Sequence, residues 1–448
     1  GDMSPEREVL MKKILRVRLL TVVLALVITV VLGLIENYFC LVPVSIHSPR
    51  AWGFIALLLV EVLFISYIVS FVTKETETTS VVIGFLILFV GYMVVWIGVS
   101  IAGSRLLNSD SYVDLIEVTE GSFEEDVIEA SSDDIISVDV LTAERLGDRT
   151  ISAITNSTLY EVDDEYNLIE YNGEWYRISP LNYGGFFKYF KANDDGIPGY
   201  VLVNAKTSEA TLVQLEEGMK YSPSAYFSYD LSRHIHNQYP SYSFGTSFFE
   251  IDEEGVPYWI TGVYEAKIGI KAGRMIESAV ITNAITGESE VYSLDKLPSW
   301  VDHVASVSYL MERIYWHYEY VNGVINFSQN GIYRTSYYYK DKRTDEETEN
   351  EYTPFDGYNS VVSKDGEFYF YTGLTPANSS ESNVGFLLIS PRTGEVRHYL
   401  SSGAEESSAQ AAAEGIVQNL RYSASFPTVV NVDGIETYFM TLKDNAGL

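Results

Sequence analysis

AVITNAITGESEVYSL, at residues 279–294, consists of two short apolar runs joined at Thr286, Gly287 and Glu288. Similar stretches occur at two other places in the chain, as GFLLISPRTGEVRHYL at 385–400 and GYVLVNAKTSEATLVQL at 199–215. Alternating apolar runs around a short turn that contains glycine are typical of a β-hairpin, because glycine tolerates positive φ. The sequence therefore predicts one kind of strand pair in three copies.

A second pattern recurs upstream of these turns and once more near the end of the chain. It reads YNGEWYRISPL at 171–181, IDEEGVPYWITG at 251–262, SKDGEFYFYTG at 363–373 and NVDGIETYFMTL at 431–442. Asn-Gly and Asp-Gly between alternating aromatic residues are strong local signals for a tight hairpin. Together the two patterns predict units that each contain an antiparallel sheet of about four short strands.

Helical patterns separate the predicted sheets. Apolar residues recur at helical spacing in four stretches, 131–146, 224–239, 299–321 and 405–420. One helix can cover the apolar face of a small antiparallel sheet. We therefore predict an α+β fold, with three N-terminal transmembrane helices followed by a large outer domain of tandem helix-plus-antiparallel-sheet units.

These patterns also predict the boundaries of the regions. The predicted regions are a three-span transmembrane region at 1–104, a linker at 105–130, α+β units at 131–223, 224–298 and 299–404, and an incomplete fourth unit at 405–448. The third unit carries an acidic insert at 341–353.

The repeated order of helix, strands and a Thr-Gly-Glu turn resembles the PepSY-type domain. The matching positions are Thr286-Gly287-Glu288 and Thr393-Gly394-Glu395, whereas Thr207-Ser208-Glu209 lacks the glycine. The resemblance covers roughly residues 125–448 as tandem units. It implies an interaction or inhibitory module outside the membrane rather than a catalyst.

The fourth unit has its helix and first hairpin, but few residues follow Gly434. A strand pair that ends there leaves an open edge, which invites pairing with another chain. We expect either that the natural chain continues past Leu448 or that the missing strands come from elsewhere. The last hairpin is expected to pack against an earlier unit or a neighbouring subunit through Val429, Val430, Tyr438 and Met440.

Three apolar runs lie before residue 104, at 19–39, 51–72 and 80–102. Each is long enough to cross a bilayer as a helix. Five basic residues precede the first run and only Arg50 follows it before the second. The positive-inside rule then places the N-terminus in the cytoplasm and the large C-terminal domain outside the membrane.

Charge and cysteine content narrow the class of protein further. Residues 105–448 hold 23 Lys and Arg against 54 Asp and Glu and so carry the whole net charge of −31. A field of that sign repels phosphates, which excludes nucleic acid as a partner. Cys40 is the only cysteine, so the outer domain has no disulfide. These features favour a multi-pass protein of the bacterial cell membrane.

Two features of the spans are candidate sites. Gly84, Gly91 and Gly98 lie seven residues apart and form a stripe that suits helix packing, among the spans or between copies of the protein. Glu61 lies halfway along the second span, where an ionised carboxylate is costly. Because no span contains Lys, Arg or His, a neutral Glu61 that bonds a neighbouring helix is favoured over a proton or ion relay.

The outer domain offers weak signals for chemistry. His234 and His236 could share a metal on a strand but not on a helix, so metal binding is not favoured. Acidic stretches at 193–199 and 252–255 lack the alternating ligands of a calcium loop. We find no motif for a nucleophile or a phosphate-binding loop and predict no catalytic residue, metal or cofactor.

The sequence therefore favours a non-catalytic, membrane-anchored binding or assembly module that engages another envelope protein or forms a homo-oligomer. Tyr and Trp crowd several predicted strands, and those left exposed would suit such a partner. An envelope hydrolase that acts on wall polymer or peptide, through carboxylates or His234 and His236, is the first alternative. An accessory subunit of a membrane transporter, acting through Glu61, is the second.

Overall fold

The computed structural model describes residues 5–74, 76–130, 135–326, 329, 331–338, 357–378 and 382–444. The predicted acidic insert at 341–353 lies outside these residues. The chain forms two compact units. The first contains the residues up to Asn108 together with His236–Ser243 and Glu265–Arg274, and the second contains the remainder.

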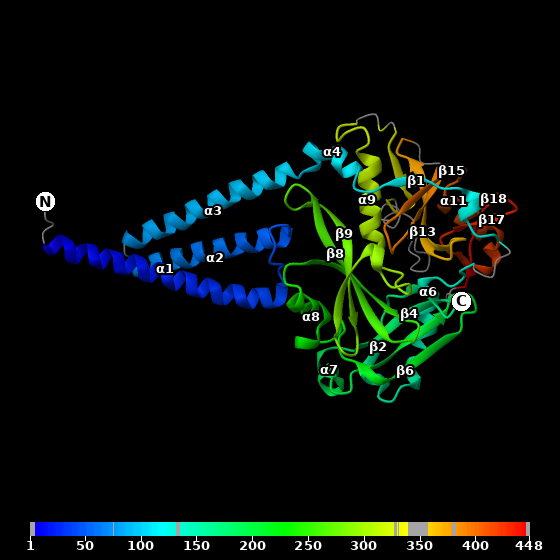
Figure 1. Cartoon of the computed structure of the whole chain (residues 1–448), viewed down its shortest axis with the longest axis horizontal. Coiled ribbons are helices and arrows are strands. Elements are labelled where there is room, and N and C mark those ends of the chain that lie inside the picture. Colours follow the sequence, from blue (N-terminus) through cyan, green and yellow to red (C-terminus); the bar gives the residue numbers. More distant parts are fainter. Residues whose placement is uncertain are drawn as a thin grey trace. The chain divides into compact units, whose positions relative to one another are not determined.

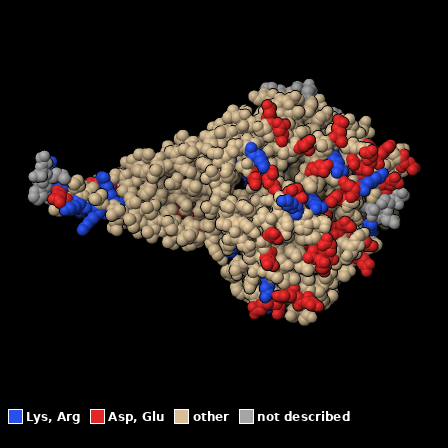
Figure 2. Space-filling model, in the orientation of Figure 1, with Lys and Arg blue, Asp and Glu red and all other residues tan. Residues whose placement is uncertain are grey.

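Three long helices make up most of the first unit (Figure 1). They are α1 (Pro5–Cys40), α2 (Pro49–Thr73) and α3 (Thr76–Ala102). All three are long and apolar enough to cross a membrane, as the sequence predicts. Figure 2 shows basic side chains at the N-terminal end of α1 and few charges along the rest of the three helices.

Two short segments from later in the chain join the first unit. Val44, in the loop between α1 and α2, donates a backbone hydrogen bond of 2.7 Å to the carbonyl of Pro240. In the hairpin tip at Glu265–Arg274, Lys271 places its Nζ 5.2 Å from the ring centre of Trp52 and 5.1 Å from that of Trp96. Tryptophans are typical of the membrane–water interface, and Trp52 and Trp96 at this end of the helices suit such a position.

Three mainly antiparallel sheets follow one another along the described part of the second unit. The first contains β2 (Tyr160–Val162), β3 (Asn167–Tyr171), β4 (Glu174–Tyr183), β5 (Ile197–Asn204) and β6 (Ala210–Met219). The second contains β7 (Ser243–Ile251), β8 (Pro257–Ile268), β9 (Ala272–Asn283) and β10 (Ser289–Ser293). The third contains β11 (Tyr333–Thr335), β12 (Asn359–Val362), β13 (Phe368–Pro376), β14 (Ser382–Ile389) and β15 (Val396–Ala404). The fold is thus mixed helix and sheet, with three long N-terminal helices and a sheet-rich C-terminal region.

The stretch predicted as a linker, 105–130, contains ordered elements. After α4 (Arg105–Val113), β1 (Val118–Glu120) pairs in parallel with β15 of the third sheet. The short helix α5 (Phe123–Asp126) follows. Parallel pairing of segments so distant in sequence leaves no local signature, so sequence patterns do not reveal it.

Three helices of the second unit begin later than their sequence patterns suggest, namely α6 (Val140–Asp148), α8 (Leu231–Gln238) and α9 (Val307–Glu319). By contrast, α11 (Glu406–Ile416) begins within one residue of its pattern, and α7 (Phe186–Ala192) lies where the sequence predicts no helix. For α9, Ser306 is the N-cap and its Oγ accepts a hydrogen bond from the Tyr309 amide. The preceding residues form no helix, because the amides of Asp302 and His303 donate to the Glu250 carboxylate instead of a helical carbonyl.

The three turns that open the sequence analysis have the same hydrogen bonds. The residue that begins each turn donates its amide to the carbonyl of the glutamate that ends it, with N···O distances of 2.9 Å for Asn204–Glu209, Asn283–Glu288 and Ser390–Glu395. Its carbonyl accepts the amide of a residue with positive φ, which is Ser208, Gly287 or Gly394. Each turn joins the two strands that the sequence analysis expects it to join.

The second residue of each turn makes the same contact in all three copies. Its carbonyl accepts hydrogen bonds from two consecutive amides in the segment that leads to a helix. The contacts are Ala205 with Ser137 and Val138 before α6, Ala284 with Lys220 and Tyr221 before α8, and Pro391 with Val304 and Ala305 before α9. The same arrangement of entry segment, helix and turn therefore occurs with each of the three sheets.

Alanine at the two turn glycines is expected to destabilise the protein unequally. Gly394 has φ of 77°, and a Cβ there would meet only Leu310, at 3.9 Å, so G394A should cost about 1 kcal/mol from backbone strain. Gly287 has φ of 78°, and its Cβ would lie 2.4 Å from the Tyr221 ring, so G287A should cost more. Urea unfolding of both variants measures the difference. G403A is the control, because Gly403 has an ordinary φ and no described atom within 4 Å of an added Cβ. Equal losses of stability in G287A and G394A would contradict the steric argument.

The last hairpin packs against an earlier part of the chain, as expected. It consists of β17 (Thr428–Val432) and β18 (Ile435–Phe439). Asn431 exchanges backbone hydrogen bonds with Ile128 and Ala130, and Val429 and Val430 are buried. Tyr438 and Met440 are only half-buried, because they lie on the outer strand and in the segment after it.

Candidate functional site

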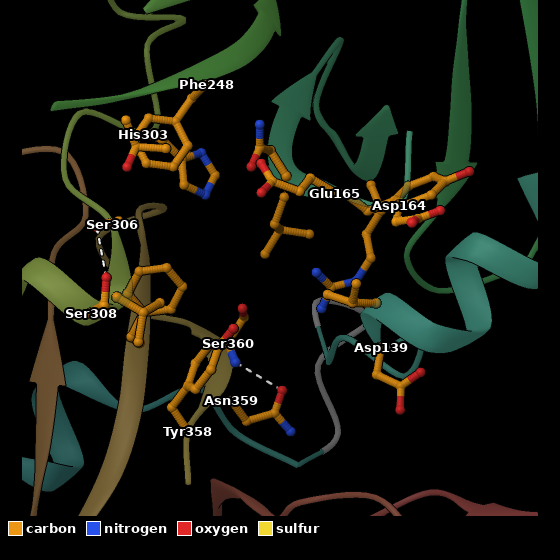
Figure 3. Close-up of a pocket in the computed structure, with 18 of the residues that line it drawn as sticks. Asp139, Asp164, Glu165, Phe248, His303, Ser306, Ser308, Tyr358, Asn359 and Ser360 are labelled. Atoms are coloured by element: carbon orange, nitrogen blue, oxygen red, sulfur yellow. Dashed lines mark hydrogen bonds between the residues drawn. The ribbon is translucent and has the colours of Figure 1, made fainter. Parts of the chain in front are cut away.

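A cavity of about 510 Å³ opens in the second unit, where residues of all three sheets meet. We call it the three-sheet pocket. Its wall includes Asn167 of β3, Arg177 of β4, Phe248 of β7, Ser360 of β12 and Phe370 of β13. Figure 3 shows Phe248 and His303 on one side of the cavity and Asp139 and Asp164 on the other.

One wall of the pocket is aromatic. The His303 ring stacks on Phe248 with 5.4 Å between ring centres and 24° between planes. Phe370 lies 6.3 Å from His303, and Tyr358 meets Phe370 edge-on at 5.4 Å. Flat aromatic surfaces of this kind bind apolar groups or the backbone of a ligand and leave its polar groups free for neighbouring residues.

Arg177 is the buried cation of the pocket. It is 4 % exposed, and its Nε donates a hydrogen bond of 2.6 Å to the carbonyl of Val138. Within the described residues, no carboxylate oxygen lies within 4.0 Å of its guanidinium nitrogens. Burial lowers the pKa of Arg177 to about 10, so the group is still charged at neutral pH. A buried charge without a counter-ion is unfavourable unless a ligand supplies one.

Behind the aromatic wall, Glu250 is fully buried and holds His303 in place. Its Oε1 accepts the His303 amide at 2.7 Å and lies 2.9 Å from His303 Nδ1, and its Oε2 accepts the Asp302 amide at 2.8 Å. Burial raises the pKa of Glu250 to about 8 and lowers that of His303 to about 3. A neutral His303 that donates from Nδ1 to Glu250 keeps Nε2 as an acceptor on the side of the pocket.

Acidic side chains line the opposite side. The side chains of Asp164 and Glu165 are exposed at the wall of the cavity. Partial desolvation by the surrounding wall, and then repulsion from Asp163, raises the pKa of the Glu165 carboxyl. Asp139 caps α6 by accepting the Thr142 amide at 2.9 Å and pairs with Lys443. The pocket therefore combines one buried cation with a rim of carboxylates.

Glu61 lies opposite another carboxyl group that the sequence analysis did not consider. Its carboxyl group lies within hydrogen-bonding reach of that of Glu36 on α1. Two carboxyl groups share a hydrogen bond only if at least one is protonated. Among these helices, the closest approach at a glycine is between Gly33 of α1 and Leu58 of α2. A Cβ at Gly33 would lie 2.7 Å from a methyl group of Leu58.

Glu61→Gln is expected to leave the stability of the helices almost unchanged, because the amide can donate to Glu36 as the protonated acid does. Glu61→Leu should lower it by about 1 kcal/mol by removing the interhelical hydrogen bond. Thermal unfolding of the detergent-solubilised protein compares the two. Equal losses in both variants would show that the proton itself, rather than the hydrogen bond, is required.

The predicted glycine stripe faces away from the other two helices. Gly84, Gly91 and Gly98 are exposed, and no described atom lies within 4 Å of a Cβ built at any of them. The stripe is therefore open to lipid or to another chain rather than filled by α1 or α2.

The two predicted metal candidates lie on a helix. His234 and His236 are two residues apart on α8, so their side chains point in different directions. His234 Nε2 lies 2.7 Å from the carbonyl of Gly287, which links α8 to one of the recurring turns. Within the described residues, no group of three or more His, Cys, Asp and Glu gathers in metal-binding geometry.

The repeat-turn residues Thr207, Thr286 and Thr393 close their turns, each by accepting the amide two residues later through its hydroxyl. None of the turn residues lines the three-sheet pocket. The pocket residues were missed because they come from segments far apart in the sequence that share no motif. Arg177 and Glu250 could have been noticed as charged residues within predicted strands.

Comparisons with protein-family models, with characterised proteins and with solved structures find no match to this chain. The proposed function is therefore based on the contacts, burial and charges of this chain's own residues.

Proposed function

We propose that this protein is a membrane-anchored binding module of the bacterial cell envelope that engages another envelope protein without catalysing a reaction. In this proposal the sheet-rich unit lies outside the membrane and consists of tandem units of the PepSY type. The matching hydrogen bonds at Ala205, Ala284 and Pro391, each between a turn and the segment entering a helix, support the repeat. The basic residues before α1 support the orientation.

The orientation has a direct test. Protease added to intact cells is expected to digest the region 105–448 and to spare an epitope placed before α1. Opening the cells with detergent provides the control, since both regions then become accessible. Protection of 105–448 in sealed cells would place the unit in the cytoplasm and remove the envelope partner from the proposal.

The observation that carries the binding function is Arg177, which is buried in the three-sheet pocket and has no carboxylate partner among the described residues. A guanidinium binds a carboxylate through two parallel hydrogen bonds, which fixes both position and orientation. We infer that the partner presents a carboxylate, from an acidic side chain or a chain terminus, in an exposed segment. The aromatic wall at Phe248 and Phe370 would hold the apolar part of that segment.

The size of the pocket fits this role. Its volume of about 510 Å³ lies within the range of small-ligand sites, roughly 300–1,000 Å³. The acidic rim at Asp164 and Glu165 would bind a cationic group of the same segment and repel a second carboxylate. The partner segment is thus expected to carry one acidic group with a basic neighbour.

Photo-crosslinking in cells tests the proposal. A benzophenone amino acid at Ser308 or Asp164, both exposed and both in the pocket wall, is expected to yield a discrete adduct with one envelope protein. The same residue at Glu216, exposed on β6 and outside the pocket, is the control. Adducts that are equal at all three positions, or absent from both pocket positions, would refute this binding site.

An envelope hydrolase is the second candidate, and one observation favours it. The Glu250–His303 pair resembles a carboxylate that orients a general base. However, no described hydroxyl is hydrogen-bonded to His303, and the hydroxyls of Ser306 and Ser308 pair with each other at 3.2 Å. Release of fragments from wall peptides by the wild type but not by H303N would favour hydrolysis over binding.

A further inference from the structure

Four phenylalanine side chains lie exposed on one part of the second unit. Phe186, Phe187 and Phe190 of α7 are 43 %, 81 % and 52 % exposed, and Phe227 of the short helix η3 (Phe227–Tyr229) is 48 % exposed. Their rings contact one another, with centres 4.9 Å apart for Phe186 and Phe190 and 6.0 Å for Phe190 and Phe227. We call these four residues the phenylalanine cluster. A contiguous exposed patch of this kind is typical of an interaction surface.

The cluster is held outward by ordered structure. Tyr189 of α7 is buried and donates a hydrogen bond of 3.1 Å to the carbonyl of Tyr226. Phe227 itself has φ of 58°, a conformation that is strained for a bulky residue. Strain of this kind is retained where the surrounding structure enforces it, and here the result is an exposed ring.

Lysines and acidic residues both lie beside the cluster. The segment 183–193 contains Lys188 and Lys191 and no acidic residue, and Asp194 and Asp195 follow it. Lys188 pairs with Glu161 at 3.2 Å, and Lys191 is exposed. Exposed phenyl rings on the same short helix as an exposed lysine suit a surface with hydrocarbon beneath a layer of phosphate.

The geometry points to insertion of the phenylalanine cluster into the interface of an anionic lipid bilayer, with Lys191 at the level of the phosphates. The phenyl edges carry no hydrogen-bonding group, which favours lipid over a polar protein surface as the occupant. Chain length keeps a bilayer within reach. Phe227 precedes Pro240 by at most roughly 45 Å of extended chain, and Pro240 bonds the loop between α1 and α2.

This contact is independent of the three-sheet pocket and holds whatever ligand that pocket binds. Its consequence is that the protein touches the membrane at two places, through its three long helices and through this cluster. The second contact restricts the orientation of the sheet-rich unit, and its strength depends on the charge of the lipid.

Spin labelling of the full-length protein tests the inference. Cys40 is the only cysteine, so C40S gives a background in which F187C can carry the sole nitroxide. Leu400, 77 % exposed on β15, provides a matched control label as L400C. Both proteins are reconstituted into nanodiscs that contain anionic lipid. Oxygen, which concentrates in lipid, and a water-soluble nickel chelate then report the depth of each label.

The expected result is an oxygen-to-nickel accessibility ratio several-fold higher at F187C than at L400C. That ratio should fall in nanodiscs without anionic lipid and when K191E is added. Equal ratios at the two sites would overturn the inference. Protection of F187C from both reagents would also overturn it, because the occupant would then be a protein or a second copy of the chain.

Discussion

Replacement of Arg177 by methionine is expected to reduce crosslinking through the three-sheet pocket by more than about tenfold while leaving the fold intact. Removing one member of a buried charge pair at an interface costs roughly 2–5 kcal/mol of binding free energy. In the unbound protein the guanidinium is buried without a carboxylate partner among the described residues, so its removal relieves an unfavourable charge. The crosslinked adduct and the thermal midpoint of unfolding are measured on the same preparation.

Arg392 is the matched control for this substitution. It pairs with Glu367 at 3.1 Å and donates to the carbonyl of Pro298 at 3.2 Å, so R392M should lower stability without a selective effect on the adduct. The opposite pattern decides against the proposal. If R177M unfolds as readily as R392M and crosslinks normally when folded, Arg177 has a structural role only.

The stability of the sheet-rich unit is expected to fall as the pH rises from about 6.5 toward 8. The carboxyl of Glu250 has a folded pKa of about 8 against 4.5 when unfolded. Between those values the folded state binds the extra proton, so stability decreases with rising pH. His303 has the opposite effect. Its pKa is about 3 in the folded state against 6.5 when unfolded, so stability increases as the pH rises between these two values. Between pH 4.5 and 6.5 the effects of Glu250 and His303 offset each other, and above 6.5 the loss due to Glu250 is no longer opposed by His303.

Glu250→Gln is expected to remove most of the alkaline loss, which is on the order of a few kcal/mol. Glutamine does not ionise, and its single oxygen can accept the amide of Asp302 or that of His303 but not both as the carboxylate does, so E250Q lowers stability at all pH values while flattening the alkaline loss. Burial and then repulsion from Glu250 also raise the pKa of Asp302, so the substitution weakens that contribution as well. Urea unfolding at pH 6 and pH 8 measures the change. Glu254→Gln, at an exposed position of the β7–β8 turn, controls for the loss of one negative charge, and an unchanged profile in E250Q would contradict the assignment.

Local patterns predicted the parts of the fold that are formed by neighbouring residues. The three long helices follow from uninterrupted apolar runs, and the turns at Gly287 and Gly394 follow from a positive-φ residue between two apolar strands. Helix starts were less predictable. The apolar spacing of α9 extends back to Trp300. The helix begins later because the amides of Asp302 and His303 donate to the carboxylate of Glu250, which lies some 50 residues earlier in the chain.

The pocket could not be predicted for the same reason. Its lining residues extend from Asp139 to Phe370 and include one Arg, one His and several Ser that carry no shared spacing. His234 and His236 are noticeable in the sequence because they lie only two residues apart, whereas the histidine in the pocket is His303. Nor could the apolar composition of the spans indicate that Glu61 would lie opposite Glu36, since helix rotation decides that contact.

Because the three-sheet pocket takes residues from all three of these sheets, it is complete only after the third sheet has been synthesised and has folded. A chain that stops after β10 contains Arg177 and Phe248 but lacks Ser360 and Phe370. During biosynthesis, an unfinished chain of this kind therefore lacks the proposed binding site. Contacts between residues so far apart also form slowly, so the pocket should be among the later parts of the protein to mature. Occupancy of the proposed site would then report that the third sheet has formed.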